Sequence, residues 1–270
     1  IDALACSRCV HVGAMPMWII PNNLPVSCQS LDNSRPVARL PRPVQATATL
    51  PVSPEAPEID VLRRGRWFAS LPSALQTRIS QLAVLRTFRT GQYLLRAGDP
   101  PRGMFGLVSG RTRHIYVVGE DREVLLHVGG PGLWTGEYVL ISRGRSINSV
   151  IADAPTRALF LSAKDWQRIV DEEPRWLSHF AVLLAERFAT AFRAYAEAQA
   201  LSHDEWVYAR LRLVAQIERE HGATASRIQL SQSHLASMVG VSRQTLNAAL
   251  GRLQKRGLLR VGFRLIELVD

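Results

Sequence analysis

Three polar residues near the C-terminus have side chains suited to reading the edges of nucleic-acid bases. Arg243, Gln244 and Asn247 follow a Gly240-Val-Ser242 turn, and they open a segment with helical periodicity. Arginine pairs with two acceptors of guanine, and glutamine or asparagine pairs with the donor and acceptor of adenine. A helix that presents all three side chains is therefore predicted to contact bases in the major groove of double-stranded DNA.

Cationic and hydroxyl side chains surround this segment and are predicted to contact DNA phosphates, which position a protein without specifying a sequence. Residues 206–270 hold ten basic and four acidic residues, a net charge of +6 out of +10 for the whole chain. No acidic residue lies between Glu220 and Glu267. The alternative is a small helical interaction domain whose cations are only solvated. The expected phosphate contacts are Ser231, Ser242, Thr245, Arg252, Lys255, Arg256, Arg260 and Arg264.

A second candidate site lies in the middle of the chain and suits a small anion. Gly136 opens one helical turn, which leaves backbone N–H groups free to bind an anion. Arg145, or Arg143 in its place, could clamp a phosphate, while Ser146 could donate from its hydroxyl. Glu137 could accept a hydrogen bond from a sugar hydroxyl. The alternative is an ion pair between Arg145 and Glu137 that closes a surface loop.

The cysteines and histidines give no metal site. Cys6 and Cys9 have a spacing that suits zinc, with His11 and Cys28 nearby. A closed zinc site needs four ligands in a folded frame, and this part of the chain is rich in proline. We expect incidental thiols, no metal, and no catalytic constellation, so the protein is not expected to be an enzyme.

The elements that must hold the base-reading residues form a winged helix-turn-helix. An amphipathic helix is predicted over 206–221, and Ser231 and Ser242 are natural N-caps of the next two helices. Gly240 permits the tight turn between these helices, and residues 257–266 are predicted to form a β-hairpin wing. The expected core positions are Leu235, Ala236, Val239, Leu246, Leu250 and Leu253.

The anion site falls in a segment of short strands. Short β-prone runs alternate with glycine turns from residue 88 to residue 161, which indicates an antiparallel roll of the jelly-roll type. An amphipathic helix over 72–85 precedes it. The runs are 93–95, 104–108, 113–118, 124–128, 147–151 and 157–161.

A long helix without Gly or Pro is predicted from Arg175 to about Leu201. Apolar residues recur along it at alternating spacings of four and three, which is the pattern of a two-stranded coiled coil. A second stripe, Trp176, Phe180 and Leu183, could pack on the strands. We therefore expect a homodimer, with one helix buried in its own chain as the alternative. The predicted dimer contacts are Leu177, Leu184, Phe188, Ala191 and Tyr195.

Composition limits the remaining choices. The chain has 270 residues and 47% apolar side chains, enough for packed cores. No apolar run approaches the ~20 residues that a membrane helix needs, and three cysteines suit a reducing, cytoplasmic location. The fold class is α+β. The expected parts are a disordered proline-rich leader (1–60), a sensor domain (61–173), a dimerisation helix (174–202) and a DNA-binding domain (203–270).

The order of β roll, long helix and winged helix-turn-helix resembles the Crp/Fnr family of bacterial transcription regulators. The resemblance covers about residues 62–268. It rests on matching residues that include Gly91, Ala97-Gly98-Asp99, Val108-Ser109-Gly110, Pro131-Gly132, Gly136-Glu137, Arg145-Ser146, Gly240-Val-Ser-Arg-Gln-Thr245, Leu253 and Gly257.

The resemblance implies a DNA-binding regulator with a cyclic-nucleotide-binding-like sensor domain. Receptors of this family place Glu on the ribose and Arg-Ser on the cyclic phosphate, which matches Glu137, Arg145 and Ser146. No cofactor is required, and cAMP or another cyclic nucleotide is the candidate effector. RNA polymerase is a candidate partner, and no membrane is involved. Two alternatives stay open: an effector-free regulator whose β roll is only a dimer scaffold, and a cyclic-nucleotide-responsive module of another class.

Overall fold

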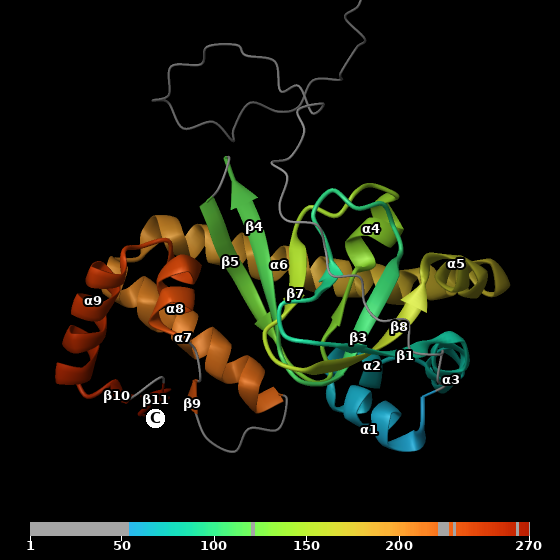
Figure 1. The fold of residues 1–270 in the computed structure, drawn as a ribbon, viewed down its shortest axis with the longest axis horizontal. Coiled ribbons are helices and arrows are strands. Elements are labelled where there is room, and N and C mark those ends of the chain that lie inside the picture. The colour runs from blue at the N-terminus through green and yellow to red at the C-terminus, as the bar shows by residue number, and fades with distance from the viewer. Residues whose placement is uncertain (1–53, 120–121, 221–226, 229–230, 263–264, 270) are drawn as a thin grey trace, which may run out of the picture. The chain divides into compact units, whose positions relative to one another are not determined.

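The computed structural model describes residues 54–119, 122–220, 227–228, 231–262 and 265–269. Three expectations lie outside these residues: the cysteine cluster with His11, most of the leader, and Arg264. Helices and strands are counted among these residues, and Figure 1 labels most of them.

From residue 54 on, three short helices precede the strands: α1 (Ala56–Arg64), α2 (Arg66–Ala69) and α3 (Ser73–Leu82). The helix α1 begins before the boundary at residue 60 that the sequence suggested, and its Leu62 is fully buried. Pro57 lies in the first turn, where a missing N–H costs no hydrogen bond, so it does not prevent the helix. The leader expected over 1–60 is therefore helical at its end. The helix predicted over 72–85 corresponds to α3, but it ends at Leu82, and residues 84 and 85 belong to the first strand.

Eight strands form the β roll in two four-stranded antiparallel sheets, with orders β1-β8-β3-β6 and β2-β7-β4-β5. The predicted β-prone runs all fall within or overlap these strands, and glycines with positive φ, such as Gly98 and Gly110, lie between them. The strands are β1 (Val84–Phe88), β2 (Tyr93–Leu95), β3 (Gly103–Ser109), β4 (Thr112–Val118), β5 (Arg122–Gly129), β6 (Trp134–Thr135), β7 (Ser149–Ala152) and β8 (Thr156–Ser162).

A short helix, α4 (Glu137–Ser142), interrupts the strands at the predicted anion site. After the last strand come α5 (Ala163–Glu172), a 3₁₀ turn over Pro174–Trp176, and the long helix α6 (Leu177–Ala200). The expected second stripe of α6 packs on the roll, because Phe180 and Leu183 are buried in the same core cluster as Trp134. Apolar burial of this kind stabilises the contact between α6 and the roll.

The C-terminal domain has three helices and a small sheet. The helices are α7 (His203–Glu220), α8 (Gln232–Val239) and α9 (Arg243–Lys255). Strands β9 (Arg227–Ile228), β10 (Leu259–Gly262) and β11 (Leu265–Leu268) pair in the order β10-β11-β9, so the predicted wing is present. The core positions predicted from the sequence are all buried: Leu235, Ala236, Val239, Leu246, Leu250 and Leu253.

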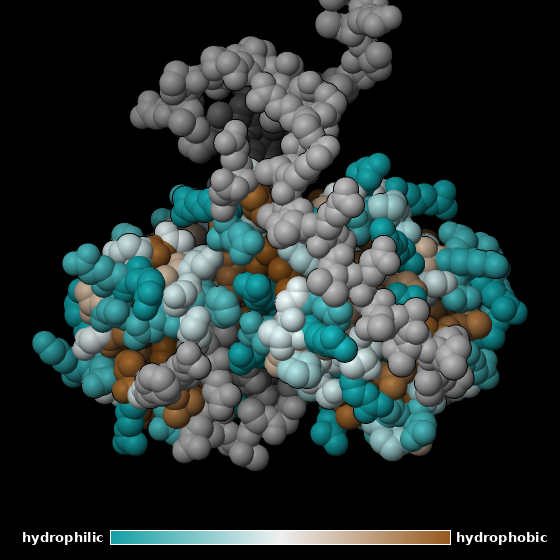
Figure 2. Space-filling model, in the orientation of Figure 1, coloured by the Kyte–Doolittle hydropathy of each residue, from teal (hydrophilic) through white to brown (hydrophobic). Residues whose placement is uncertain are grey.

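Polar side chains dominate the face drawn in Figure 2, with smaller areas of apolar atoms between them. Exposed large apolar residues occur on the β4–β5 hairpin (Tyr116, Val118 and Leu126) and along α6. Single exposed apolar residues are ordinary, but a row of them along one helix indicates an interaction surface.

Candidate nucleic-acid interface and effector site

The two predicted helix caps fix the geometry of the helix-turn-helix. The Ser231 hydroxyl accepts a hydrogen bond from the His234 amide at 3.1 Å, and the Ser242 hydroxyl accepts one from the Thr245 amide at 3.0 Å. Between them Gly240 adopts φ 73°, a left-handed conformation that glycine tolerates without strain. The hydroxyls of Ser242 and Thr245 lie 2.8 Å apart. Three of the expected phosphate-contacting hydroxyls therefore also hold the helix starts.

One face of α9 is buried and the opposite face is open. Leu246, Leu250 and Leu253 pack inside the domain, while Arg243, Gln244 and Asn247 are exposed at the beginning of the helix. The structure thus brings the three predicted base-contacting residues together on one accessible surface. Their position at a helix N-terminus adds the favourable end of the helix dipole for a polyanion.

The cations expected to contact phosphates include exposed side chains and one that forms a bidentate ion pair. Lys255, Arg256 and Arg260 are exposed beyond the base-reading residues. Arg252 instead forms a bidentate pair with Asp204 of α7, with both nitrogen–oxygen distances at 2.7 Å. The Arg252 guanidinium lowers the pKa of Asp204. In this structure Arg252 ties α9 to the start of α7. That Arg252 also contacts a phosphate stays a prediction.

The wing is joined to α9 by a residue that the sequence did not single out. The Gln254 side-chain oxygen accepts a hydrogen bond from the Val261 amide at 3.0 Å. The wing strand β10 is therefore held against the end of α9, and Arg260 lies on that strand. This contact keeps Arg260 of the wing near the cations at the end of α9.

At the anion site, α4 starts as predicted. Gly136 precedes it with φ 106°, and a Cβ there would lie 2.7 Å from the Gly103 carbonyl oxygen. Only glycine fits this close approach without strain. Glu137 follows as the first residue of α4, and only 6% of its surface is exposed.

The ionic partner of Glu137 is Arg187 of α6, which sequence reasoning missed. The Arg187 Nε lies 3.9 Å from the Glu137 carboxylate, and another Arg187 nitrogen donates to the Trp134 carbonyl at 2.9 Å. Burial raises the pKa of Glu137, and Arg187 partly opposes this effect. Arg187 also brings positive charge from α6 to the start of α4.

Arg145 and Ser146 point to other partners, so the ion pair considered between Arg145 and Glu137 is not formed. Arg145 is exposed and donates to the Gly98 carbonyl at 2.7 Å. Ser146 is buried and donates to the Asn148 carbonyl at 2.8 Å. The four residues predicted for this site therefore lie at the start of α4 and on the loop after it, with the Glu137 carboxylate facing Arg187.

The two strand histidines lie side by side on β4 and β5. His114 and His127 are cross-strand partners with ring centroids 5.3 Å apart. Burial, with a smaller contribution from Arg187, lowers the pKa of His114 to about 3, so the ring is neutral at ordinary pH. Among the described residues no group of three or more His, Cys, Asp or Glu side chains could hold a metal ion.

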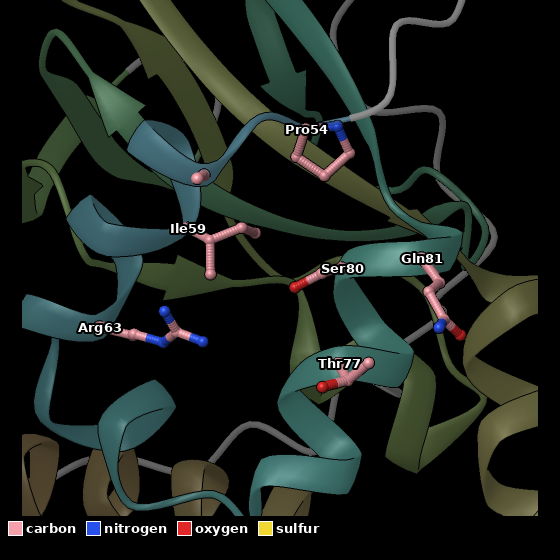
Figure 3. A pocket seen from close by; sticks show the side chains of 7 residues that line it. Pro54, Ile59, Arg63, Thr77, Ser80 and Gln81 are labelled. Atoms are coloured by element: carbon pink, nitrogen blue, oxygen red, sulfur yellow. The ribbon is translucent and has the colours of Figure 1, made fainter.

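An open hollow of about 560 Å³ lies between α1 and α3 (Figure 3). Ile59 and Arg63 reach it from α1, and Thr77, Ser80 and Gln81 reach it from α3. None of the predicted DNA-contacting or effector-binding residues lines it. Arg63 already bonds Asp60 and Gln76, so this hollow offers no free charged group.

Two family models match consecutive parts of the chain. Residues 85–173 match the cyclic nucleotide-binding domain, and residues 209–270 match the Crp-like helix-turn-helix domain. The chain belongs to the Crp/Fnr family of transcription regulators. Members of this family are DNA-binding regulators, and the two matched domains contain the two candidate sites described above.

Two curated Crp/Fnr relatives illustrate the match. The cyclic AMP receptor protein of Thermus thermophilus is 28% identical over 188 residues, which cover 67% of this chain and 82% of that protein. The CRP-like cAMP-activated global transcriptional regulator of Mycobacterium tuberculosis is 25% identical over 214 residues, which cover 78% of this chain and 95% of that protein.

Solved structures of the family share the fold. The c-di-GMP responsive global regulator CLP of Xanthomonas campestris has a TM-score of 0.62 at 22% identity, covering 74% of this chain and all of that one. FixK2 of Bradyrhizobium japonicum also has a TM-score of 0.62, at 18% identity, and the match covers 70% of this chain and 93% of FixK2.

A different class of protein shares only part of the chain. Glutaminase 1 of Bradyrhizobium diazoefficiens is 30% identical over 117 residues, which are 42% of this chain and 18% of the glutaminase. A match to less than a fifth of that enzyme gives no reason to assign its activity here. Among the helices that the structure describes, none is long and apolar enough to cross a bilayer.

Proposed function

We propose that this protein is a cytoplasmic, homodimeric transcription regulator that binds a near-palindromic DNA site through α9. The observation that supports this most is the exposed trio Arg243, Gln244 and Asn247 at the start of a helix whose other face is buried. Two such helices, one from each protomer, would enter successive major grooves about 34 Å apart. Lys255, Arg256 and Arg260 would contact the phosphates on either side. No enzymatic activity is part of this proposal.

The exposed row on α6 supports the homodimer. Phe188, Phe192 and Tyr195 are 69%, 63% and 61% exposed, and Phe188 stacks on Phe192 at 6.0 Å. The predicted contacts Leu177, Leu184 and Ala191 lie on the same heptad seam as Phe188 and Tyr195. Side chains this large and this exposed favour burial against an identical helix.

The proposed effector is a cyclic nucleotide bound at Gly136, Glu137, Arg145 and Ser146, with Arg187 as an added residue. The amides at the start of α4 and the charge of Arg187 would attract the phosphate, and the buried Glu137 carboxylate would accept from a hydroxyl. The family match to the cyclic nucleotide-binding domain supports this class of ligand.

A specific observation favours the alternative of an effector-free regulator. Glu137 already has Arg187 as its ionic partner, and Arg145 already bonds Gly98. Isothermal titration calorimetry with cAMP and with cGMP separates the two possibilities. Heat with either nucleotide, lost in Glu137→Ala, supports the effector site. No heat with either, alongside intact DNA binding, favours the effector-free regulator in which the roll is a dimer scaffold.

The DNA-binding proposal is tested by selecting genomic fragments with the purified protein and measuring binding by fluorescence anisotropy. Arg243→Ala should weaken binding to a selected fragment by about 1–3 kcal/mol and relax the preference at one base position. Lys255→Ala should weaken all fragments about equally and reduce the salt dependence by about one counterion. If Arg243→Ala binds every fragment as wild type does, the assignment of α9 is wrong. RNA polymerase, as a further candidate partner, would be tested by transcription from a selected fragment.

A further inference from the structure

The strand β5 is the edge of its sheet, and its open edge is capped by the helix-turn-helix. The Leu125 amide donates to the Ser237 hydroxyl at 3.1 Å, and that hydroxyl donates to the Glu123 carbonyl at 3.0 Å. Unpaired backbone groups on a sheet edge need partners. The Ser237 hydroxyl of α8 therefore satisfies two of these backbone groups: it accepts from the Leu125 amide and donates to the Glu123 carbonyl.

A second contact uses an irregularity in the same strand. His114 pairs with His127 and Ile115 pairs with Leu125, so Leu126 is an extra residue with no partner across the ladder. Arg210 of α7 donates to the Leu126 carbonyl at 3.4 Å. The Arg210 side chain is buried beside the Trp206 ring, with the guanidinium carbon 5.2 Å from the ring centroid.

Apolar side chains complete this contact. Leu125 and Ile115 of the roll belong to the same buried cluster as Met238 of α8 and Leu211 of α7. The combination of Ser237, Arg210 and the backbone of Glu123–Leu126 is called the β5 latch below. Hydrogen bonds fix its register, and the apolar cluster supplies burial.

The latch does not cover the base-reading surface. Arg243, Gln244 and Asn247 remain exposed while Ser237 is bonded to β5. The covalent connection from α6 to α7 is only Leu201 and Ser202, and Leu201 is extended. Without the latch, only this short joint and the apolar cluster would set the direction in which α9 faces.

We infer that Ser237 is a positioning residue, which orients the DNA-binding domain on the β roll so that both recognition helices of a dimer fit one site. This inference rests on the proposed function, because it concerns binding to two half-sites by a dimer. Holding the two DNA-binding domains of a dimer in the right orientation before binding raises the affinity only for DNA that both domains contact. It therefore raises affinity for a duplex with two half-sites and leaves affinity for one half-site unchanged.

The test compares Ser237→Ala with wild type on two probes. The first probe is the tightest duplex that the full-length wild-type protein selects from a random library. The second is the same duplex with one half-site scrambled. Ser237→Ala should bind the two-half-site duplex about five- to tenfold more weakly, the effect of losing about one hydrogen bond. It should bind the one-half-site duplex equally well, and its Leu125 amide should exchange hydrogen faster.

Two further variants control for side effects. Ser233→Ala removes an exposed hydroxyl from the same helix and should behave as wild type. Ser237→Thr keeps the hydroxyl and should restore affinity for the two-half-site duplex. Equal losses on both duplexes would show a folding defect and overturn the positioning role, and so would an unchanged or tighter two-half-site affinity. If the wild type selects no duplex, the proposed function itself is wrong and the positioning role falls with it.

Discussion

Glu137 is a buried carboxyl whose ionic partner, Arg187, is partly exposed, and its chemistry is testable without a ligand. Burial raises the pKa of Glu137 above its ordinary value of 4.5. Between the pKa of the unfolded chain and that of the folded protein, the folded protein therefore holds a proton that the unfolded chain has lost. The stability contribution of Glu137 is therefore present at low pH and falls as the pH rises through the folded pKa.

Glu137→Gln should remove this loss of stability at higher pH. Because glutamine does not ionise, the free energy of unfolding of the variant should exceed that of wild type increasingly as the pH rises from 4.5 through the folded pKa of Glu137. Urea denaturation at several pH values measures the difference. A difference that stays constant across this range would contradict the buried, destabilised carboxylate.

Glu172→Gln is the matched control with the opposite sign. The hydrogen bond from Arg78 lowers the pKa of Glu172, so its contribution is present above its ordinary pKa and lost as the pH falls. The free energy of unfolding of this variant should fall below that of wild type at pH 7, and the two should converge in acid. The difference in the free energy of unfolding between variant and wild type should therefore change with pH in opposite directions for the two variants. Opposite changes distinguish the buried carboxyl of Glu137 from a surface ion pair.

At the scale of elements, local signals in the sequence predicted the structure well. Ser231, Gly240 and Ser242 determine the caps and the turn through contacts within a few residues, so their roles could be predicted without tertiary information. Six of the eight strands of the roll followed from β-prone runs bounded by glycines, whereas β1 and β6 were not predicted. The helix α1 was missed because prolines were taken to exclude a helix, although Pro57 lies in the first turn.

Contacts between distant residues could not be predicted from a single sequence. Arg187 meets Glu137 across fifty positions of the chain, and Arg252 meets Asp204 across forty-eight. Neither partner is marked by spacing or periodicity, because both pairs depend on how packed helices approach other elements. The same holds for Ser237, whose partners are backbone groups of β5.

The turn of the helix-turn-helix gives a prediction at this scale. Gly240→Ala should lower the free energy of unfolding by about 1–2 kcal/mol, because alanine resists the left-handed conformation. A Cβ at Gly240 would meet nothing within 4 Å, so the cost is conformational and not steric. Thermal or urea unfolding of the full chain provides the measurement.

Gly251 supplies the control for this substitution. It lies inside α9, and a Cβ there also meets nothing within 4 Å. Gly251→Ala should stabilise the protein by about 0.5–1 kcal/mol, since alanine is the better helix former. If both substitutions shift stability in the same direction, the conformational role of Gly240 is wrong.

For the whole molecule, the seam on α6 determines whether the protein can bind a symmetric site. Phe188→Glu should convert the dimer to a monomer, because it would place two charges in an apolar interface. Sedimentation velocity measures the change. Ala189→Glu, on the exposed outer side of the same helix, should leave the dimer intact. A Phe188→Glu variant that sediments as wild type does would exclude this seam as the interface.

The central claim is that two copies of α9 read double-stranded DNA as a symmetric pair. Selection of duplexes from a random library by the full-length protein tests it most directly. We predict enrichment of two inverted half-sites separated, centre to centre, by about 10 base pairs or a multiple of that distance. Enrichment of no sequence, or of a single motif without an inverted partner, would contradict the claim.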